Sequence, residues 1–234
     1  MGALDAILQR QPIWRGGSLA RQIAALATGF TALDAELPGG GWPRQALTEI
    51  LGDEPGVGEL GLILPALAAL TSAGQRAVCV APPHIPYAPA LAAAGIDLAN
   101  LLIVRPQSRR DALWTAEQAL RSGSCHALAA WLPRVRYVEL QRLSVAAEAG
   151  RAAVFIFRPL AATAESSPAC LRLLLEPAGL ELGVRIVKRR GAPRMAPLHL
   201  PLKRPFHVLG RVTPSGPGGG DARPARRLGL PVHA

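Results

Sequence analysis

Hydrophobic and polar positions follow one another along this chain in a pattern that predicts strands and helices in turn. Short apolar runs, typical of buried strands, occur at 46–51, 76–81, 100–106, 126–132 and 152–157. Segments with apolar residues spaced three and four apart predict helices at 58–73, 87–95, 109–121 and 135–149. Strands alternating with helices indicate right-handed βαβ units, and uninterrupted apolar strands fit a parallel sheet covered on both faces.

The pattern changes beyond the fifth predicted strand. "CLRLLLEPAGLELGVRIVKRR" (170–190) predicts two strands across a Pro-Ala-Gly turn, a β-hairpin at one edge of the sheet. Further on, "TPSGPGGGDARPARR" has the composition of a disordered linker. We therefore expect three parts: an N-terminal arm (1–27), an α/β core (28–193) and a Pro/Gly/Arg-rich tail (194–234) that is largely disordered. Pro65 lies inside a predicted helix and should destabilise or kink it.

Charge separates the tail from the rest of the chain. The net charge is +10, yet residues 1–187 contain 16 Lys/Arg and 15 Asp/Glu, whereas residues 188–234 contain ten Lys/Arg and a single acid, Asp221. A nearly neutral domain thus carries a basic tail. Arg223, Arg226 and Arg227 could supply weak, salt-dependent contacts to DNA phosphates, or they could only keep the tail soluble.

Composition also excludes several classes of protein. No apolar run reaches the roughly 18 residues that span a bilayer, and the N-terminus does not resemble a secretory signal, so we expect a cytoplasmic protein without a membrane partner. The cysteines, Cys79, Cys125 and Cys170, form no C-x-x-C pair. They predict small buried side chains in a reducing compartment and neither a metal nor a redox centre.

One glycine cluster comes close to a phosphate-binding loop. "GDEPGVGEL" (52–60) lies between a predicted strand and a predicted helix, which is the context that the motif G-x-x-x-x-G-K-[ST] requires. Gly52, Gly56 and Gly58 are present, but Glu59 follows where Lys is needed, and counting from Gly52 supplies no Lys either. A carboxylate about 4 Å from a phosphate charge costs about 4 kcal/mol at an effective dielectric near 20. The loop therefore predicts a vestigial site that no longer works.

The residues around this loop resemble a known family. "TGFTALDAELPGGGWP" (28–43), the loop itself and "ELGVRIVKRRGAP" (181–193) are similar to the core of the bacterial recombinase RecA. The resemblance implies a RecA-like fold with a P-loop-type core, a mainly parallel sheet flanked by helices, an edge β-hairpin and a disordered basic C-terminal tail.

The resemblance is narrower than RecA itself. "WRGGSLA", "APPHIPYAPALAAAGIDLANLL" and "RDALWTAEQALRSG" resemble the ImuA family, RecA-related accessory proteins often labelled SulA-like after the cell-division inhibitor. This implies a mutasome component of the SOS response, acting in DNA-damage tolerance by error-prone translesion synthesis (SOS mutagenesis), close to the nucleoid when induced. The implied partners are an ImuB-type inactive Y-family polymerase homologue, an error-prone replicative-type DNA polymerase and RecA. A SulA-like inhibitor of the division GTPase and an atypical DNA-stimulated ATPase remain alternatives.

Two further positions that hold catalytic acids in RecA-like ATPases have no Asp or Glu in this chain. The catalytic Glu would follow the second strand, where "APPHIPYAP" has none, and the Walker B Asp would end the fourth strand, where Trp131 stands. With the Lys missing as well, the resemblance implies a pseudo-ATPase without a cofactor. RecA's two DNA-binding loops would follow the fourth and fifth strands, but here they shrink to "LPRVRY" and "RPLAATAESSPA".

The candidate contact residues lie at three places. Lys188, Arg189 and Arg190 end the hairpin, where the resemblance implies a docking surface and a solvated strand end is the alternative. All four tryptophans are expected to pack inside, but Trp42, which follows three glycines, is the best aromatic candidate for a partly exposed partner surface. In the tail, "RLGLPV" places Leu228 and Leu230 in a sequence similar to the sliding-clamp motif of polymerases, or in an apolar island of no function.

Overall fold

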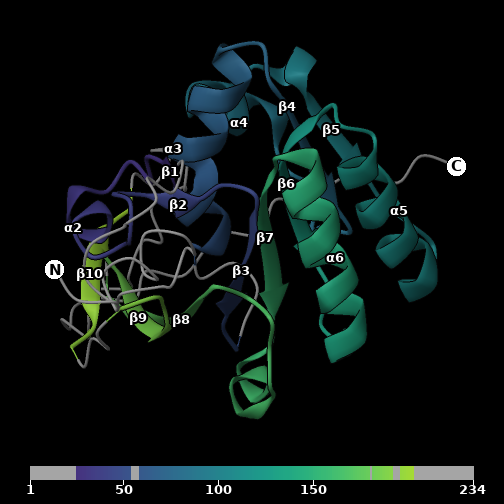
Figure 1. The fold of residues 1–234 in the computed structure, drawn as a ribbon. Coiled ribbons are helices and arrows are strands. Elements are labelled where there is room, and N and C mark those ends of the chain that lie inside the picture. Colours follow the sequence, from purple (N-terminus) through teal and green to yellow (C-terminus); the bar gives the residue numbers. More distant parts are fainter. Residues whose placement is uncertain (1–24, 54–57, 180, 192–195, 203–234) are drawn as a thin grey trace, which may run out of the picture.

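The computed structural model describes residues 25–53, 58–179, 181–191 and 196–202, and one large sheet forms its centre (Figure 1). The order across this sheet is β10-β9-β8-β3-β7-β6-β4-β5. Its strands are β3 (Ala46–Leu51), β4 (Arg76–Val80), β5 (Leu101–Val104), β6 (Cys125–Trp131), β7 (Ala153–Arg158), β8 (Leu171–Ala178), β9 (Glu181–Lys188) and β10 (Leu198–Pro201). A second, two-stranded sheet pairs β1 (Ala25–Leu26) with β2 (Trp42–Pro43).

Strand direction confirms the predicted class of fold. β3 pairs in parallel with both β7 and β8, and the β7–β6–β4–β5 ladder is parallel throughout. The predicted hairpin is the antiparallel pair β8–β9. The fold is therefore an α/β core with a mainly parallel sheet, as the RecA resemblance implied, and the parallel strands all end at one edge, where ligands bind in open α/β sheets.

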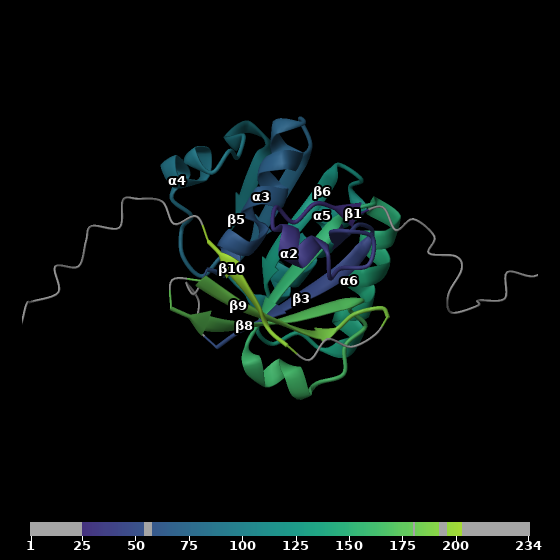
Figure 2. The same ribbon diagram turned by 90° about the vertical axis from the view of Figure 1, so that its left-hand side faces the viewer.

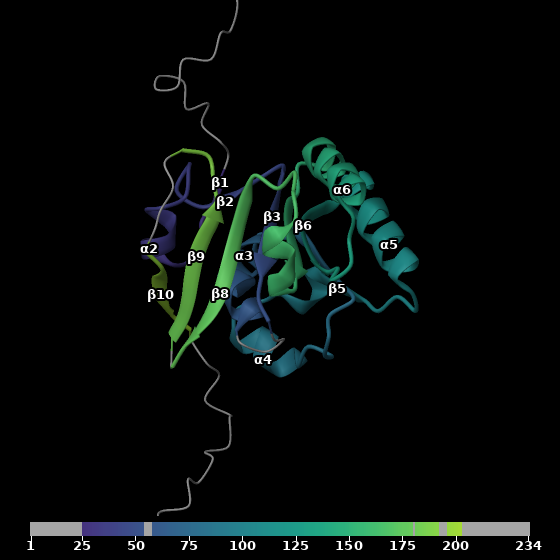
Figure 3. The same cartoon turned by 90° about the horizontal axis from the view of Figure 1, so that it is seen from below.

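Helices cover both faces of the sheet (Figure 3). One face carries α2 (Thr31–Asp34), α3 (Glu59–Ser72) and α4 (Ala88–Ala93), and the other carries α5 (Arg109–Arg121) and α6 (Tyr137–Gly150). Two 3₁₀ turns, η1 (Leu98–Asn100) and η2 (Leu160–Ala164), complete the described elements. Successive residues of a strand point to opposite faces, so Phe155 belongs to the core under α3 while Val154 belongs to the core under α5 and α6.

Pro65, which was predicted to destabilise or kink its helix, lies inside a continuous α3. α3 continues from Glu59 to Ser72, because its stability comes mainly from the buried apolar face rather than from local propensity. The proline ring packs against Gly29, where an added Cβ would lie 2.4 Å from Pro65 Cβ. Gly29 also has φ +85°, so both its backbone conformation and its contact with Pro65 require glycine.

One strand lies where a disordered tail was expected. β10 lies next to β9 and pairs antiparallel with it (Figure 2). It buries Leu198 and Leu200, while His199 and Pro201 stay exposed. The expectation was wrong for 198–202, because this short alternating segment completes the sheet edge that β9 would otherwise leave open. The N-terminal arm up to residue 24 and the tail from residue 203 lie outside the described residues. No helix in the described part of the chain is long and apolar enough to cross a membrane.

Candidate functional site

The glycine loop connects β3 to α3 at the edge where the parallel strands end. Gly52 follows β3, and Gly58 caps α3 with φ 111°, a left-handed conformation that favours glycine. Gly56 lies outside the described residues. The Glu59 carboxylate accepts a hydrogen bond from the Gly58 backbone N–H at 3.3 Å. A carboxylate of the chain thus binds an N–H group that a phosphate would use at a helix N-terminus.

An apolar side chain also covers this loop. A Cβ built on Gly58 would lie 2.2 Å from Leu202 Cδ1, and one built on Gly61 would lie 3.4 Å from Leu202 Cδ2. Leu202 therefore lies against the first turn of α3, directly after β10, and packs on the core under that helix. No local pattern indicated this contact, because residue 202 was assigned to the tail. A phosphate that used the Gly58 N–H would have to displace the Glu59 carboxylate.

Aromatic rings occupy the end of the fourth parallel strand. Trp131 ends β6 and stacks on Phe157 of β7, with ring centroids 4.4 Å apart and planes 14° apart. Both rings pack on the same core as α3. Within the described residues, no group of three or more His, Cys, Asp or Glu side chains could hold a metal ion. This edge offers stacking and apolar packing where a RecA-like ATPase would place an acid beside Mg²⁺.

We expect Gly58→Ala to lower the free energy of unfolding by about 1–3 kcal/mol, because alanine is strained at this φ. Some of that loss comes from crowding against Leu202 Cδ1, so it should shrink in the background of Leu202→Ala. A double-mutant cycle measured by urea unfolding gives the coupling. Strictly additive effects would show that Leu202 does not lie over the loop.

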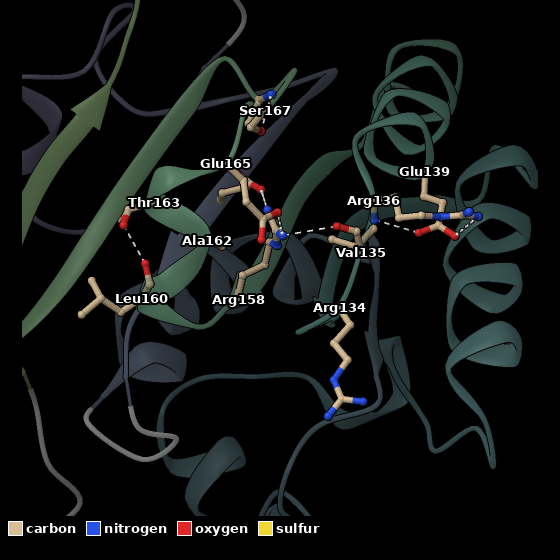
Figure 4. A network of polar contacts seen from close by, with 12 residues as sticks. Arg134, Val135, Arg136, Glu139, Arg158, Leu160, Ala162, Thr163, Glu165 and Ser167 are labelled. Atoms are coloured by element: carbon tan, nitrogen blue, oxygen red, sulfur yellow. Dashed lines mark hydrogen bonds and ion pairs between the residues drawn. The ribbon is translucent and has the colours of Figure 1, made fainter.

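A buried ion cluster joins three neighbouring strands beneath the same edge. Glu49 of β3 is fully buried and accepts from Arg158 Nη1 at 2.8 Å and from Arg172 Nε at 2.6 Å. Arg158 Nη2 also binds Glu165 Oε2 at 2.6 Å and the Val135 carbonyl at 3.2 Å (Figure 4). Burial alone would lower the pKa of Arg158, but the bonds to Glu165 and Glu49 outweigh it and raise that pKa. The arginine therefore stays charged inside the protein.

The cluster fixes the segment that follows β7. Arg172 donates to the carbonyls of Ala162 at 2.6 Å, Glu165 at 3.2 Å and Thr163 at 3.3 Å, all within or just after η2. In the RecA resemblance this segment corresponds to a DNA-binding loop. Here its backbone carbonyls are bound to a buried arginine, so the described conformation is a packed turn.

The three basic residues at the end of the β8–β9 hairpin differ in what they contact. Arg189 pairs with Glu36 at 3.0 Å, with both side chains largely buried, and also donates to the Glu36 carbonyl. Lys188 Nζ donates to the Ser167 carbonyl at 2.9 Å. Arg190 is exposed. Arg189 thus connects the end of β9 to the α2 region. Lys188 and Arg190 remain at the surface, and their interface role stays a prediction.

Trp42 is not on the surface, and this prediction was wrong. Its side chain is fully buried and packs edge-on against Phe155, with centroids 5.2 Å apart. The reason is the close approach that glycine allows: a Cβ on Gly41 would lie 2.4 Å from the Leu26 carbonyl oxygen, and this approach pairs β2 with β1 over the core. Among the tryptophans that the structure describes, the exposed one is Trp114 on α5, 63% of which is accessible, although we expected it to pack inside.

The remaining residues singled out from the sequence are those of the tail and the three cysteines. Arg223, Arg226, Arg227, Leu228 and Leu230 lie outside the described residues. Cys79 and Cys125 are buried as expected, and burial raises the pKa of each thiol to about 12. Cys170 is partly buried, which also raises its pKa. These thiols are protonated at neutral pH and are poor nucleophiles.

Comparison with known proteins agrees with the fold. The RecA N-terminal domain family matches residues 8–135. RecA of Rubrobacter xylanophilus is 35% identical over 124 residues, which are 51% of this chain and 36% of that protein. RecA of Chlorobaculum parvum is 37% identical over 110 residues, 46% of this chain and 30% of that protein. The chain thus spans about a third of the length of the curated relatives that it matches.

The sheet order, the loop at its edge and the family match define the class as RecA-type α/β proteins. This chain belongs to the RecA N-terminal domain family, as the resemblance of the loop region suggested.

Proposed function

We propose that this chain is a non-catalytic RecA-like accessory factor of error-prone translesion DNA synthesis, induced in the SOS response and acting through contacts with other proteins. Membership of the RecA N-terminal domain family supports a role in the response to DNA damage. The observation that carries the non-catalytic part is the loop itself, where Glu59 binds the Gly58 N–H and Leu202 lies over the first turn of α3.

The proposed partners follow from the ImuA resemblance alone. They are the ImuB-type polymerase homologue, the error-prone replicative-type polymerase and RecA. A RecA fold that does not turn over nucleotide can offer RecA-type surfaces without a cycle of binding and release. We place its action in the cytoplasm, at the nucleoid after damage.

The catalytic part of this proposal is tested with the purified chain, Mg-ATP and single-stranded DNA. We expect no hydrolysis above the protein-free background and no saturable binding at micromolar nucleotide, because the loop has no Lys and its N-terminal turn is covered. RecA measured in parallel is the positive control. DNA-stimulated turnover would establish the ATPase alternative instead.

The cellular part is tested by deletion and complementation. Deletion should lower the frequency of damage-induced mutations, and both the wild-type chain and Glu59→Ala should restore it equally, since the loop needs no chemistry. Immunoprecipitation after damage should recover the polymerase homologue or RecA. If deletion instead changes cell filamentation and the division GTPase is recovered, the SulA-like alternative is correct.

A further inference from the structure

The outward surface of α5 and α6 carries apolar and cationic side chains in two stripes. On α5, Arg110, Trp114 and Arg121 are spaced four and seven residues apart, and on α6, Val138, Arg142 and Val145 are spaced four and three apart. These spacings place each set on one side of its helix. All six residues are exposed, and we call them the α5–α6 face.

A buried acid brings the two stripes together. Glu117 of α5 is 6% exposed, accepts from Arg142 of α6, and pairs with Arg121 of its own helix at 2.7 Å. At the other end, Arg109 of α5 pairs with Glu139 of α6. Figure 1 shows the two helices side by side along their length. The two stripes therefore belong to one continuous surface.

The apolar residues of this face are not needed by the core. α5 already buries Ala112, Ala116 and Leu120 against the sheet, and α6 buries Leu140, Leu143 and Ala147. Trp114, Val138 and Val145 are each 63–64% exposed. One exposed valine needs no explanation, but a tryptophan between arginines on one helix, with two exposed valines on the neighbouring helix, has the composition of a binding hot spot.

The charge of the face limits what can bind there. Residues 105–150, which contain both helices, hold seven arginines against Asp111, Glu117, Glu139 and Glu148. Burial would raise the pKa of Glu139, but hydrogen bonds from Arg136 and the charges of Arg136 and Arg109 lower it. The negative charge of Glu139 is therefore already paired with arginines of this surface. Arg110 and Arg134 form no ion pair with an acid in the described part of the chain. An occupant must therefore be acidic.

This requirement separates the possible occupants. The chain's own tail is basic, so it is repelled, and a symmetric dimer through this face would place arginines against arginines. Single-stranded nucleic acid binds by stacking bases on several aromatic rings, whereas Trp114 is the single ring among the six residues of the α5–α6 face. Apolar side chains of a helix fit between such residues, and acidic ones on its flanks meet the arginines.

We propose that the α5–α6 face docks an acidic amphipathic helix of a partner protein, with Trp114 as its apolar anchor and Arg110 as its free cation. This inference rests on the proposed function, since it names the surface through which an accessory factor would make one of its contacts. The first-formed encounter is steered by charge, and the complex is then held by burial of the indole.

The test measures binding of the full chain to purified polymerase homologue, replicative-type polymerase and RecA, separately, at two salt concentrations. Trp114→Ala and Arg110→Glu should each weaken binding to one of these proteins about tenfold or more, and the Arg110→Glu effect should shrink at high salt. Tyr87→Ala, another exposed aromatic, and Arg185→Glu, an equal charge change on β9, are the matched controls and should bind like wild type.

Each remaining outcome has a definite meaning. If an acidic segment of the bound protein is mapped, Glu→Lys changes in it should rescue Arg110→Glu. Equal binding by wild type and Trp114→Ala overturns the face but leaves the proposed function intact. Binding of wild type to none of the three proteins overturns the proposed function itself. If the two variants lose only binding to a 30-nucleotide oligo-dT, the face binds DNA instead of a protein helix. If they lose only self-association in sedimentation, the face binds a second copy of this chain.

Discussion

Replacing Glu49 with leucine should lower the free energy of unfolding by about 3–5 kcal/mol, the range seen when one member of a buried ion pair is removed. Glu49 is the shared acceptor of Arg158 and Arg172, and all three side chains are at most 7% exposed. Without it Arg172 keeps only carbonyl partners, and Arg158 keeps Glu165, which is itself 56% exposed. Urea unfolding followed by far-UV circular dichroism measures the change.

The matched control for this prediction is Glu176→Leu. Glu176 also lies on a strand of the sheet and pairs with Arg185 at 2.9 Å, but both side chains are substantially exposed. An exposed pair contributes only about 0–1 kcal/mol, so this variant should unfold near the wild-type midpoint. Equal midpoints for Glu49→Leu and Glu176→Leu would mean that the cluster does not hold β3, β7 and β8 together.

The alternation of strands and helices was predictable because both periodicities are local. Apolar strands such as 152–157 and the helix at 109–121 are confirmed within a residue or two, and so is the hairpin. The RecA-like class followed from the loop region and is confirmed by the family match. The narrower ImuA assignment stays a prediction, as do the partners that it implies.

What the sequence could not give depends on residues distant along the chain. Glu49 lies 109 residues from Arg158 and 123 from Arg172, so no local pattern indicates their pairing. β10 is four residues long and surrounded by prolines, and only its pairing with β9 makes it a strand. Leu202 reaches Gly58 because that pairing brings the end of β10 to the start of α3.

The two tryptophans show where a local signal was misread and where it was overlooked. Three glycines before Trp42 suggested an exposed loop, whereas Gly41 allows the backbone of Leu26 to approach and so buries the indole. Trp114 could have been assigned correctly from the sequence. It is two residues from each of Ala112 and Ala116, and a shift of two residues turns a side chain about 200° around a helix.

This correction leads to the second large effect that we expect. Trp42→Ala should lower the free energy of unfolding by about 3–5 kcal/mol, because it removes a fully buried indole that packs edge-on against Phe155. Trp114→Ala, the matched control, should change it by no more than about 0.5 kcal/mol, since most of that side chain is in solvent. Urea unfolding is best followed by far-UV circular dichroism, because both variants remove a fluorophore.

The same pair of variants separates stability from binding. Trp42→Ala weakens every activity to the extent that it lowers the folded population, and cooling or a stabilising osmolyte should recover part of the loss. Trp114→Ala stays folded, so any loss of partner binding comes from the α5–α6 face alone and does not respond to osmolyte. A Trp42→Ala chain that unfolds at the wild-type urea midpoint would mean that the indole lies at the surface after all, and the partner surface should then be sought beside β2.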